Sequence, residues 1–223
     1  MAAGCGGLRA SLALVLALLV AGCAGEQRRG PPPTYAVRPG DTLYSIAWRN
    51  RLDFHDLARW NGLASDYRIE VGQVLRLTPG GPAAAARPRA EPPARLPVTA
   101  PPHWAWPADG VLLGSVEMPS GGVGLRIGGA SGGAVRAAAA GRVVYKGAGL
   151  RAYGQLVIIK HDDTWLSAYG YNREVLVAEG ESVREGQPIA TMGEGPGNRP
   201  MLYFEIRRNG RPVDPRSQLP PRG

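Results

Sequence analysis

The chain has 223 residues, of which 44% are hydrophobic, and a formal net charge of +8. At roughly 150 residues per domain this is enough for one medium domain and one small one, while 32 Gly and 21 Pro indicate that linkers make up the rest. Without the N-terminal 22 residues the charge is +7, of which +1 falls in residues 34–78, +2 in residues 104–219 and +4 in linkers and tail. Nucleic-acid binding needs basic side chains clustered on one face, so this distribution excludes it as the main function.

The N-terminus predicts export. A single charge, Arg9, precedes a ten-residue apolar run over residues 12–21, which is the pattern of a signal peptide and too short for a membrane span of about 20 residues. The ending Val20-Ala21-Gly22-Cys23 resembles the lipobox of bacterial lipoproteins. This resemblance implies a signal peptide over residues 1–22, lipidation of Cys23, and, because Ala24 follows, retention at the periplasmic face of the outer membrane. Cys5 would leave with the signal peptide, so no disulfide is expected.

Residues 34–78 predict a small α+β domain of the order βααβ. A strand over 34–38 precedes a turn in which Asp41 and Thr42 are both candidate helix N-caps. A helix is expected from Leu43 to Asn50, and a second one, capped by Asp53, through Trp60 and closed by Asn61-Gly62. Val74 to Leu77 is the predicted returning strand.

This unit resembles a LysM domain. The match rests on Tyr35-Ala36-Val37-Arg38-Pro39-Gly40-Asp41-Thr42-Leu43, Ile46-Ala47, Leu57, Asn61-Gly62-Leu63 and Ile69-Glu70-Val71-Gly72-Gln73-Val74-Leu75. LysM domains bind glycans that contain N-acetylglucosamine, so the resemblance implies peptidoglycan glycan strands as the partner. It places the glycan site in two loops, at Gly40, Asp41, Thr42, Leu43, Asp66, Tyr67 and Ile69. The alternative is that these residues are structural, with Gly40 supplying a positive φ, Asp41 a cap and Ile69 core packing.

Two segments have the composition of linkers. Residues 23–33 end in three prolines and are the expected tether to the membrane. Residues 79–103 are rich in Pro, Ala and Arg and cannot bury enough apolar surface to fold. We therefore expect the domains on either side of this linker to move independently, with a short tail over residues 220–223.

Residues 104–219 predict an all-β domain, an antiparallel sandwich or barrel-like sheet, because short β-rich runs alternate with glycine turns and no long amphipathic helix interrupts them. The predicted strands are Ala134 to Ala139, Arg142 to Tyr145, Leu156 to Lys160, Trp165 to Tyr169, Pro188 to Met192 and Leu202 to Ile206. The glycine-rich stretch 121–133 is interpreted as a loop. In the last strand, alternation directs Leu202, Phe204 and Ile206 to the core and Met201, Tyr203 and Glu205 to the opposite face.

This domain resembles the LytM, or lysostaphin-type, peptidases. The match rests on Trp106-Pro107, on Gly141-Arg142-Val143-Val144-Tyr145, on Tyr153-Gly154-Gln155 through Lys160-His161, on Ser167-Ala168-Tyr169, on Val183-Arg184-Glu185-Gly186-Gln187-Pro188 and on Phe204-Glu205-Ile206. Active members of this family hold one zinc ion with a His, an Asp four residues later and the second His of a His-x-His strand, and two further histidines assist. Three protein ligands and one open position for water are what catalytic zinc requires.

The chain departs from this pattern at all five positions. The first ligand position falls at Gly122 and the Asp position at Arg126, whose charge would repel a cation. Gly170-Tyr171 stands where one assisting histidine would follow Ala168-Tyr169, and Met201-Leu202-Tyr203 stands where His-x-His is expected. His103 and His161 have no partners from which a metal site could be rebuilt. We therefore expect no metal, no cofactor and no hydrolytic activity.

Within the LytM family the chain looks most like the NlpD-type activator lipoproteins, through the loop 147–154, the run 166–172, the closing Val213-Asp214-Pro215 and the order lipobox, LysM, linker, LytM. This resemblance implies a non-enzymatic activator of an N-acetylmuramoyl-L-alanine amidase of the AmiC type at the division septum. The amidase would bind the former catalytic groove, at Gly122, Arg126, Tyr171, Met201 and Tyr203. The alternatives are that these residues only fill a vacated cavity, that the chain is a passive tether, or that it is a zinc endopeptidase.

Overall fold

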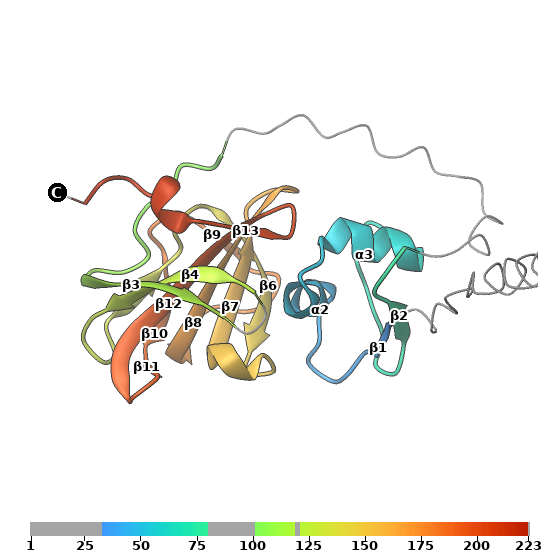
Figure 1. Cartoon of the computed structure of the whole chain (residues 1–223), viewed down its shortest axis with the longest axis horizontal. Helices are drawn as coiled ribbons and strands as arrows, with labels where there is room; N and C mark the ends of the chain where they lie inside the picture. The colour runs from blue at the N-terminus through green and yellow to red at the C-terminus, as the bar shows by residue number, and fades with distance from the viewer. Residues whose placement is uncertain (1–32, 80–100, 119–120, 223) are drawn as a thin grey trace, which may run out of the picture. The chain divides into compact units, whose positions relative to one another are not determined.

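The structure, a computed structural model, describes residues 33–79, 101–118 and 121–222 (Figure 1). The predicted signal peptide, Cys23, the tether and most of the linker lie outside these residues. No helix within the described ranges is long and apolar enough to cross a membrane.

The first domain has the predicted βααβ order. Strand β1 (Thr34–Ala36) pairs antiparallel with β2 (Val74–Arg76), and α2 (Leu43–Asn50) and α3 (Phe54–Asn61) lie between them in the chain and beside the pair in space (Figure 1). Both helices are confirmed, and each strand is one or two residues shorter than predicted.

Local chemistry sets the helix boundaries. Thr42 is the N-cap of α2 and forms a capping box with Ser45, in which each backbone N–H donates to the other residue's hydroxyl at 3.0–3.1 Å. Asp53 caps α3 by accepting from the His55 N–H at 2.8 Å. Gly62 ends α3 with φ 63°, the left-handed conformation that glycine adopts without a Cβ penalty.

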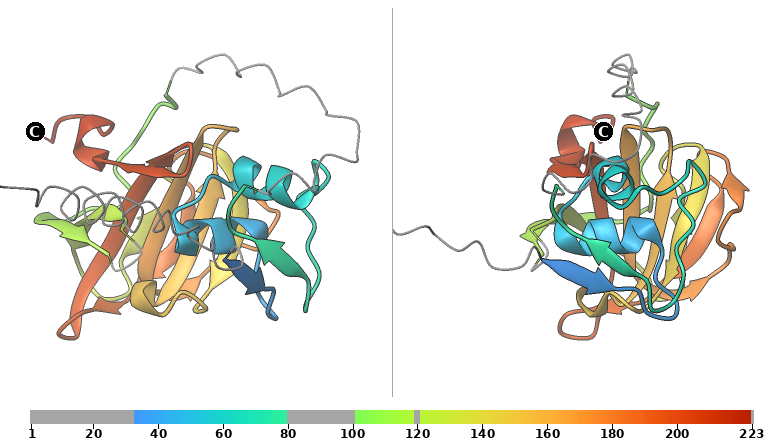
Figure 2. Two further views of the ribbon diagram at one scale, coloured as in Figure 1. Left: turned by 45° about the vertical axis from the view of Figure 1, so that its right-hand side comes forward. Right: turned by 90° about the vertical axis from the view of Figure 1, so that its right-hand side faces the viewer.

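The second domain is an antiparallel β-domain, as predicted. Among the described residues, eleven strands join into one hydrogen-bonded sheet whose main path runs β3-β4-β12-β8-β7-β6-β9 (Figures 1 and 2). The strands on this path are β3 (Val111–Glu117), β4 (Val123–Gly128), β6 (Gly141–Gly147), β7 (Gln155–Lys160), β8 (Trp165–Val175), β9 (Ser182–Val183) and β12 (Arg199–Arg208). Off the path, β5 (Ala134–Arg136) pairs with β10 (Pro188–Met192), which also pairs with β8, while β11 (Glu194–Gly195) and β13 (Arg211–Val213) pair with β12. The single-turn helices η2 (Arg151–Tyr153) and η3 (Pro215–Ser217) complete the domain.

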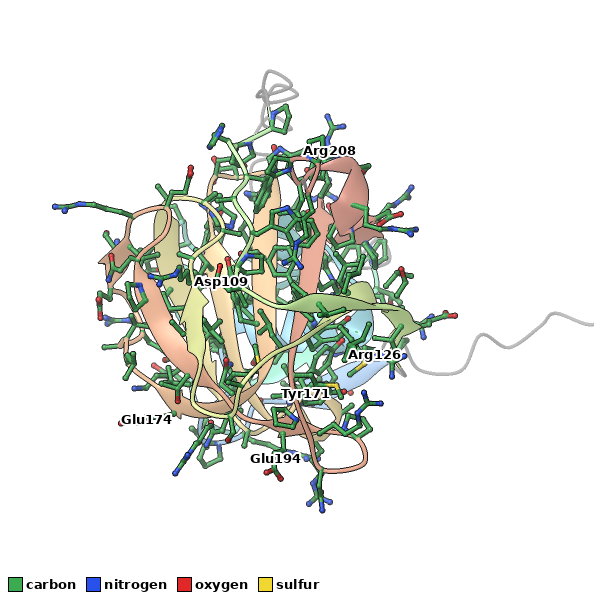
Figure 3. All side chains as sticks on the ribbon, turned by 90° about the vertical axis from the view of Figure 1, so that its left-hand side faces the viewer. Asp109, Arg126, Tyr171, Glu174, Glu194 and Arg208 are labelled. Atoms are coloured by element: carbon green, nitrogen blue, oxygen red, sulfur yellow. The ribbon has the colours of Figure 1, made fainter. Side chains whose placement is uncertain are left out.

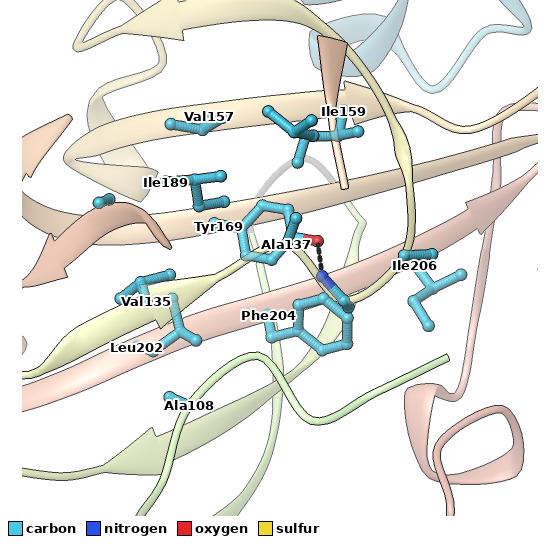
Figure 4. Packing of buried hydrophobic residues seen from close by; sticks show 14 of the residues in the cluster. Ala108, Val135, Ala137, Val157, Ile159, Tyr169, Ile189, Leu202, Phe204 and Ile206 are labelled. Carbon is cyan, nitrogen blue, oxygen red and sulfur yellow. Dashed lines mark hydrogen bonds between the residues drawn. The ribbon is translucent and has the colours of Figure 1, made fainter. Parts of the chain in front are cut away.

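The main core of this domain lies on one face of β12. Leu202, Phe204 and Ile206 join it together with Val135, Val157, Ile159, Tyr169 and Ile189 (Figure 4). Tyr203 belongs to a different hydrophobic cluster. The predicted division of the two faces of this strand is therefore confirmed.

The loop interpretation of residues 121–133 is wrong, because β4 occupies residues 123–128. Its glycines serve close packing rather than turn geometry: a Cβ on Gly124 would lie 2.6 Å from the Tyr203 ring and 2.7 Å from the Phe204 carbonyl oxygen. Glycine within a strand marks such close approach of a neighbour. The β3 strand before it is also absent from the prediction.

A second cluster of buried side chains draws on both domains. It combines Ile46 and Trp48 of the helical domain with Leu156, Ile158 and Tyr203 of the sheet. The sequence predicts domains that move independently, whereas the structure places them in contact across this cluster.

Candidate functional site

The side chains of β12 that face away from the main core form a continuous buried row. Met201, Tyr203, Glu205 and Arg207 alternate along the strand, and none is more than 2% exposed. Such burial is unusual for a glutamate and an arginine, which are almost never fully buried unless they are paired. This row therefore fills the predicted partner groove, whose residues Met201 and Tyr203 are buried.

The start of β4 approaches this row closely. Arg126 lies opposite Tyr203 in the β4–β12 register. A Cβ added to Gly122 would lie 2.3 Å from a carboxylate oxygen of Glu205. The carboxylate thus occupies the space that a side chain at position 122 would need.

Glu205 links the two other polar side chains of this row, Tyr203 and Arg207. The Tyr203 hydroxyl donates to Glu205 Oε2 at 2.6 Å, and Arg207 Nε donates to Glu205 Oε1 at 2.6 Å. Burial raises the pKa of Glu205, although the charge of Arg207 and the hydrogen bonds partly offset it. Burial, followed by the negative charge of Glu205, also raises the pKa of Tyr203, which keeps its hydroxyl protonated as a donor.

Arg126 and Tyr171, both labelled in Figure 3, lie beside Tyr203 of this row and are half-buried. Tyr171 has a left-handed backbone, with φ 61°, and its ring centroid is 6.1 Å from that of Tyr203. Burial raises the pKa of Tyr171, while the positive charge of Arg126 lowers it in part, so the two side chains are within electrostatic reach. Of the five residues predicted to bind a partner, these two remain accessible in part, and Gly122, Met201 and Tyr203 are buried.

The side chains present do not fit a zinc ion. Protein ligands of zinc are imidazole nitrogens, thiolates and carboxylates, and glycine, arginine, methionine and tyrosine stand at the family positions. Glu205 is the carboxylate of this row, and both of its oxygens are hydrogen-bonded. Within the part of the chain that the structure describes, no three His, Cys, Asp or Glu side chains gather in an arrangement able to hold a metal.

The two histidines of this region have structural partners. His103 Nδ1 lies 2.9 Å from Glu185 Oε2 on the surface. His161 Nδ1 lies 2.7 Å from the Ala140 carbonyl oxygen, Nε2 lies 2.7 Å from Ser167 Oγ, and its ring meets Trp104 edge to face at 4.9 Å. Burial lowers the pKa of His161 to about 4, so the ring is neutral at pH 7.

In the first glycan loop, several predicted residues have structural partners. Asp41 Oδ2 accepts from the Tyr35 hydroxyl at 2.7 Å and from the Arg38 N–H at 2.9 Å. Thr42 caps α2, Leu43 is buried, and Gly40 has φ 79° with open space around its Cβ position. These contacts hold the loop in shape and leave Gly40 open to solvent.

The second glycan loop carries an exposed Asp66, which accepts from the Arg68 N–H at 3.3 Å, and half-buried Tyr67 and Ile69. Tyr67 has a left-handed backbone, with φ 54°, and its ring packs edge to face on Phe54 at 5.4 Å. The structure thus packs the Tyr67 ring against Phe54, while the glycan-binding role of both loops stays a prediction.

A pocket of about 490 Å³ opens beside the first of these loops. Its lining residues are Tyr35, Arg38, Pro39, Asp41, Arg49, Ala148, Gly149 and Arg151. Arg49 donates to the Tyr35 hydroxyl at 2.5 Å and lies 3.4 Å from Asp41, whose charge it partly neutralises. Arg38 and Arg151 add two further positive charges, so the pocket is cationic overall.

Sequence reasoning missed the charged end of the β12 row. Arg207 continues the alternation of Met201, Tyr203 and Glu205, and this spacing was the available signal. Its partner beyond Glu205, Trp48, is distant in sequence: Arg207 Nη1 donates to the Trp48 carbonyl oxygen at 2.9 Å. No pattern within one strand predicts such a contact.

Comparison with known families agrees with this two-domain arrangement. Residues 35–78 match the LysM domain, and residues 121–215 match Peptidase family M23. The chain is therefore a LysM protein with an M23-type β-domain.

Several curated proteins are similar to this chain over most of its length. The Lipoprotein NlpD/LppB homolog of Pseudomonas aeruginosa is 42% identical, with 90% of this chain and 82% of the relative aligned. The lipoprotein YgeR of Escherichia coli is 36% identical over 94% of this chain and 92% of its own length. The Murein hydrolase activator NlpD of Salmonella typhimurium is 35% identical, with 85% of this chain and 68% of the relative aligned. The chain belongs to the NlpD family of lipoproteins.

Proposed function

We propose that this protein is a lipoprotein of the outer membrane, anchored through Cys23 at the periplasmic face, that binds peptidoglycan through its LysM domain and activates a cell-wall amidase. The partner is an N-acetylmuramoyl-L-alanine amidase of the AmiC type, and the place of action is the division septum. The chain itself does not hydrolyse peptidoglycan.

The observation that carries this proposal is the filled groove of a retained peptidase sheet. Glu205 and Tyr203 occupy the space that side chains at positions 122 and 124 would need, and the family's ligand positions hold side chains that do not bind zinc. The sheet nonetheless keeps its antiparallel pairing and a packed core. A relative's name, Murein hydrolase activator, supports a role in which this fold acts on another enzyme.

The glycan-binding part of the proposal rests on the LysM match and on the two loops. Tyr67 presents a half-buried ring in a fixed position, and Gly40 leaves room for close approach. Aromatic faces and backbone groups at such loops suit a sugar with acetamide groups.

The test is release of label from dye-labelled sacculi by the mature chain alone, by a cognate amidase alone and by both together. We expect release above the level of the amidase alone only in the mixture. Release by the mature chain without amidase would mean that it is a hydrolase. Sedimentation with sacculi but no stimulation would mean that it is a passive tether.

A charge-reversing variant locates the activating surface. Arg126→Glu should weaken stimulation about fivefold or more, since truncated or reversed charges at an interface centre cost on the order of 1 kcal/mol or more. Arg184→Glu makes the same charge change at an exposed turn before β10 and serves as the matched control. Equal stimulation by both variants would exclude the β4–β12 edge as the partner site.

A further inference from the structure

We infer that helix α2 of the LysM domain is docked on the face of the sheet that carries the buried β12 row, and that this docking closes that face to any protein partner until the LysM domain is released. The inference rests on the proposed function for the identity of that partner, an amidase. The docking itself rests on contacts between the two domains.

The centre of the contact is a buried arginine that needs both domains. The Arg207 guanidinium stacks on the Trp48 ring at 3.7 Å from its centroid and donates to the Trp48 carbonyl oxygen at 2.9 Å. Both side chains are 1% exposed. A charge is tolerated at such a depth only when it is paired and hydrogen-bonded, and Glu205 and Trp48 provide these partners from either side.

Apolar side chains surround this contact. Leu156 and Ile158 of β7, Leu166 and Ala168 of β8, and Tyr203 of β12 belong to one buried cluster with the α2 residues Leu43, Ile46, Ala47 and Trp48. An apolar surface of this kind on a sheet is what a partner protein or a packed helix covers. Here the helix that covers it comes from the same chain.

The rim of the contact is polar and close-fitting. His55 Nε2 lies 3.8 Å from Asp163 Oδ1, and Lys160 Nζ lies 5.7 Å from the Phe54 ring centroid. A Cβ on Gly210, in the β12–β13 turn, would lie 2.6 Å from the Asp53 backbone nitrogen. Glycine at this position therefore permits the approach of the two backbones.

Such a contact is suited to reversible closure. Interfaces between domains of one chain resemble transient protein interfaces, and exposed ion pairs at the rim add little stability. A linker makes the docking intramolecular, so a weak contact is occupied most of the time. An amidase that binds the same face has to displace the helix. Its apparent affinity is therefore its affinity for the open chain multiplied by the fraction of chains that are open.

The closed state is measured directly by cross-linking. In the lipid-free mature chain carrying Cys23→Ser, the paired changes His55→Cys and Asp163→Cys place two thiols across the contact. We expect a short bismaleimide to join them in most molecules under native conditions and in few under denaturant. A native yield no higher than the denatured yield would overturn the docking.

An opening variant and its control come from two glycines with the same backbone. Gly210 has φ 71° and Gly186 has φ 74°, so replacement by asparagine has a similar backbone cost at both positions. The Cβ would lie 2.6 Å from the Asp53 nitrogen at position 210, whereas nothing lies within 4 Å of it at position 186. Gly210→Asn should lower the cross-linking yield and raise amidase binding and stimulation about fivefold. Gly186→Asn should leave all three unchanged.

The two proposals fail in different ways. If the cross-linked chain stimulates the amidase as well as the reduced chain does, closure does not gate this face and the inference is overturned. If neither the parent nor Gly210→Asn stimulates any amidase while cross-linking proceeds as expected, the docking stands and the proposed function fails.

Discussion

At the scale of single residues, His161 carries one ring proton because its two nitrogens face different partners. The Ala140 carbonyl oxygen can only accept, so Nδ1 holds the proton, and Nε2, 2.7 Å from Ser167 Oγ, is left as an unprotonated acceptor. A second proton would remove that acceptor and place a charge beside Trp104. Burial, which disfavours the charged ring, is the main physical cause of the lowered pKa of His161.

The lowered pKa predicts acid sensitivity. The pKa of His161 is about 4 in the folded chain and 6.5 when unfolded, so between these values the unfolded state binds the extra proton. Stability is therefore unaffected above pH 6.5 and falls as the pH drops from 6.5 to 4, by up to about 3 kcal/mol. Urea unfolding at several pH values should show this slope, and His161→Gln should flatten it. An unchanged slope in the variant would assign the acid sensitivity to other groups.

The buried pair of Glu205 and Arg207 predicts non-additive effects. Glu205→Ala leaves the Arg207 charge without its carboxylate and should cost about 3–5 kcal/mol of unfolding free energy. The double change Glu205→Met and Arg207→Met removes both charges, keeps the volume and should cost less than the single change. Denaturant unfolding of the parent and of these two variants measures the two costs. A double variant less stable than Glu205→Ala would show that the pair stabilises the domain beyond mutual compensation.

At the scale of elements, short-range chemistry made the helical domain predictable. Thr42 and Asp53 are strong N-caps and Gly62 closes the second helix, so both helices follow from local signals. Strand β12 was predictable for a related reason, because Leu202, Phe204 and Ile206 alternate with side chains of a different kind. Its true length, from Arg199 to Arg208, depends on the neighbours with which it pairs.

Strand β4 was not predictable from its own residues. Glycine disfavours strands in isolation, and Gly122 and Gly124 gave the stretch the composition of a loop. Any larger residue at these two positions would collide with Glu205 or Tyr203, which lie some 80 residues further along the chain. The loss of the zinc ligands could be inferred from a family pattern. That Tyr203 of β12 lies beside Arg126 of β4 could be seen only from the register in which the two strands pair.

At the scale of the whole molecule, the predicted glycan loop and the docked helix are adjacent in sequence and share one pocket. The loop over residues 40–43 leads directly into α2. One wall of the pocket comes from this loop and its neighbours Tyr35 and Arg49, and the other from Ala148, Gly149 and Arg151 of the β-domain. We predict that a glycan strand bound at this loop pushes these walls apart.

Glycan binding is therefore predicted to open the chain. Long purified glycan strands should lower the cross-linking yield of the cysteine pair at positions 55 and 163 in proportion to their binding. Because coupling between two equilibria is reciprocal, Gly210→Asn should bind the strands more tightly than the parent, by about fivefold, and Gly186→Asn should match the parent. Sedimentation of the chain with the strands measures the affinities. A cross-linking yield that stays constant at saturating glycan would show that the two events are independent and that another ligand, such as the amidase, releases the LysM domain.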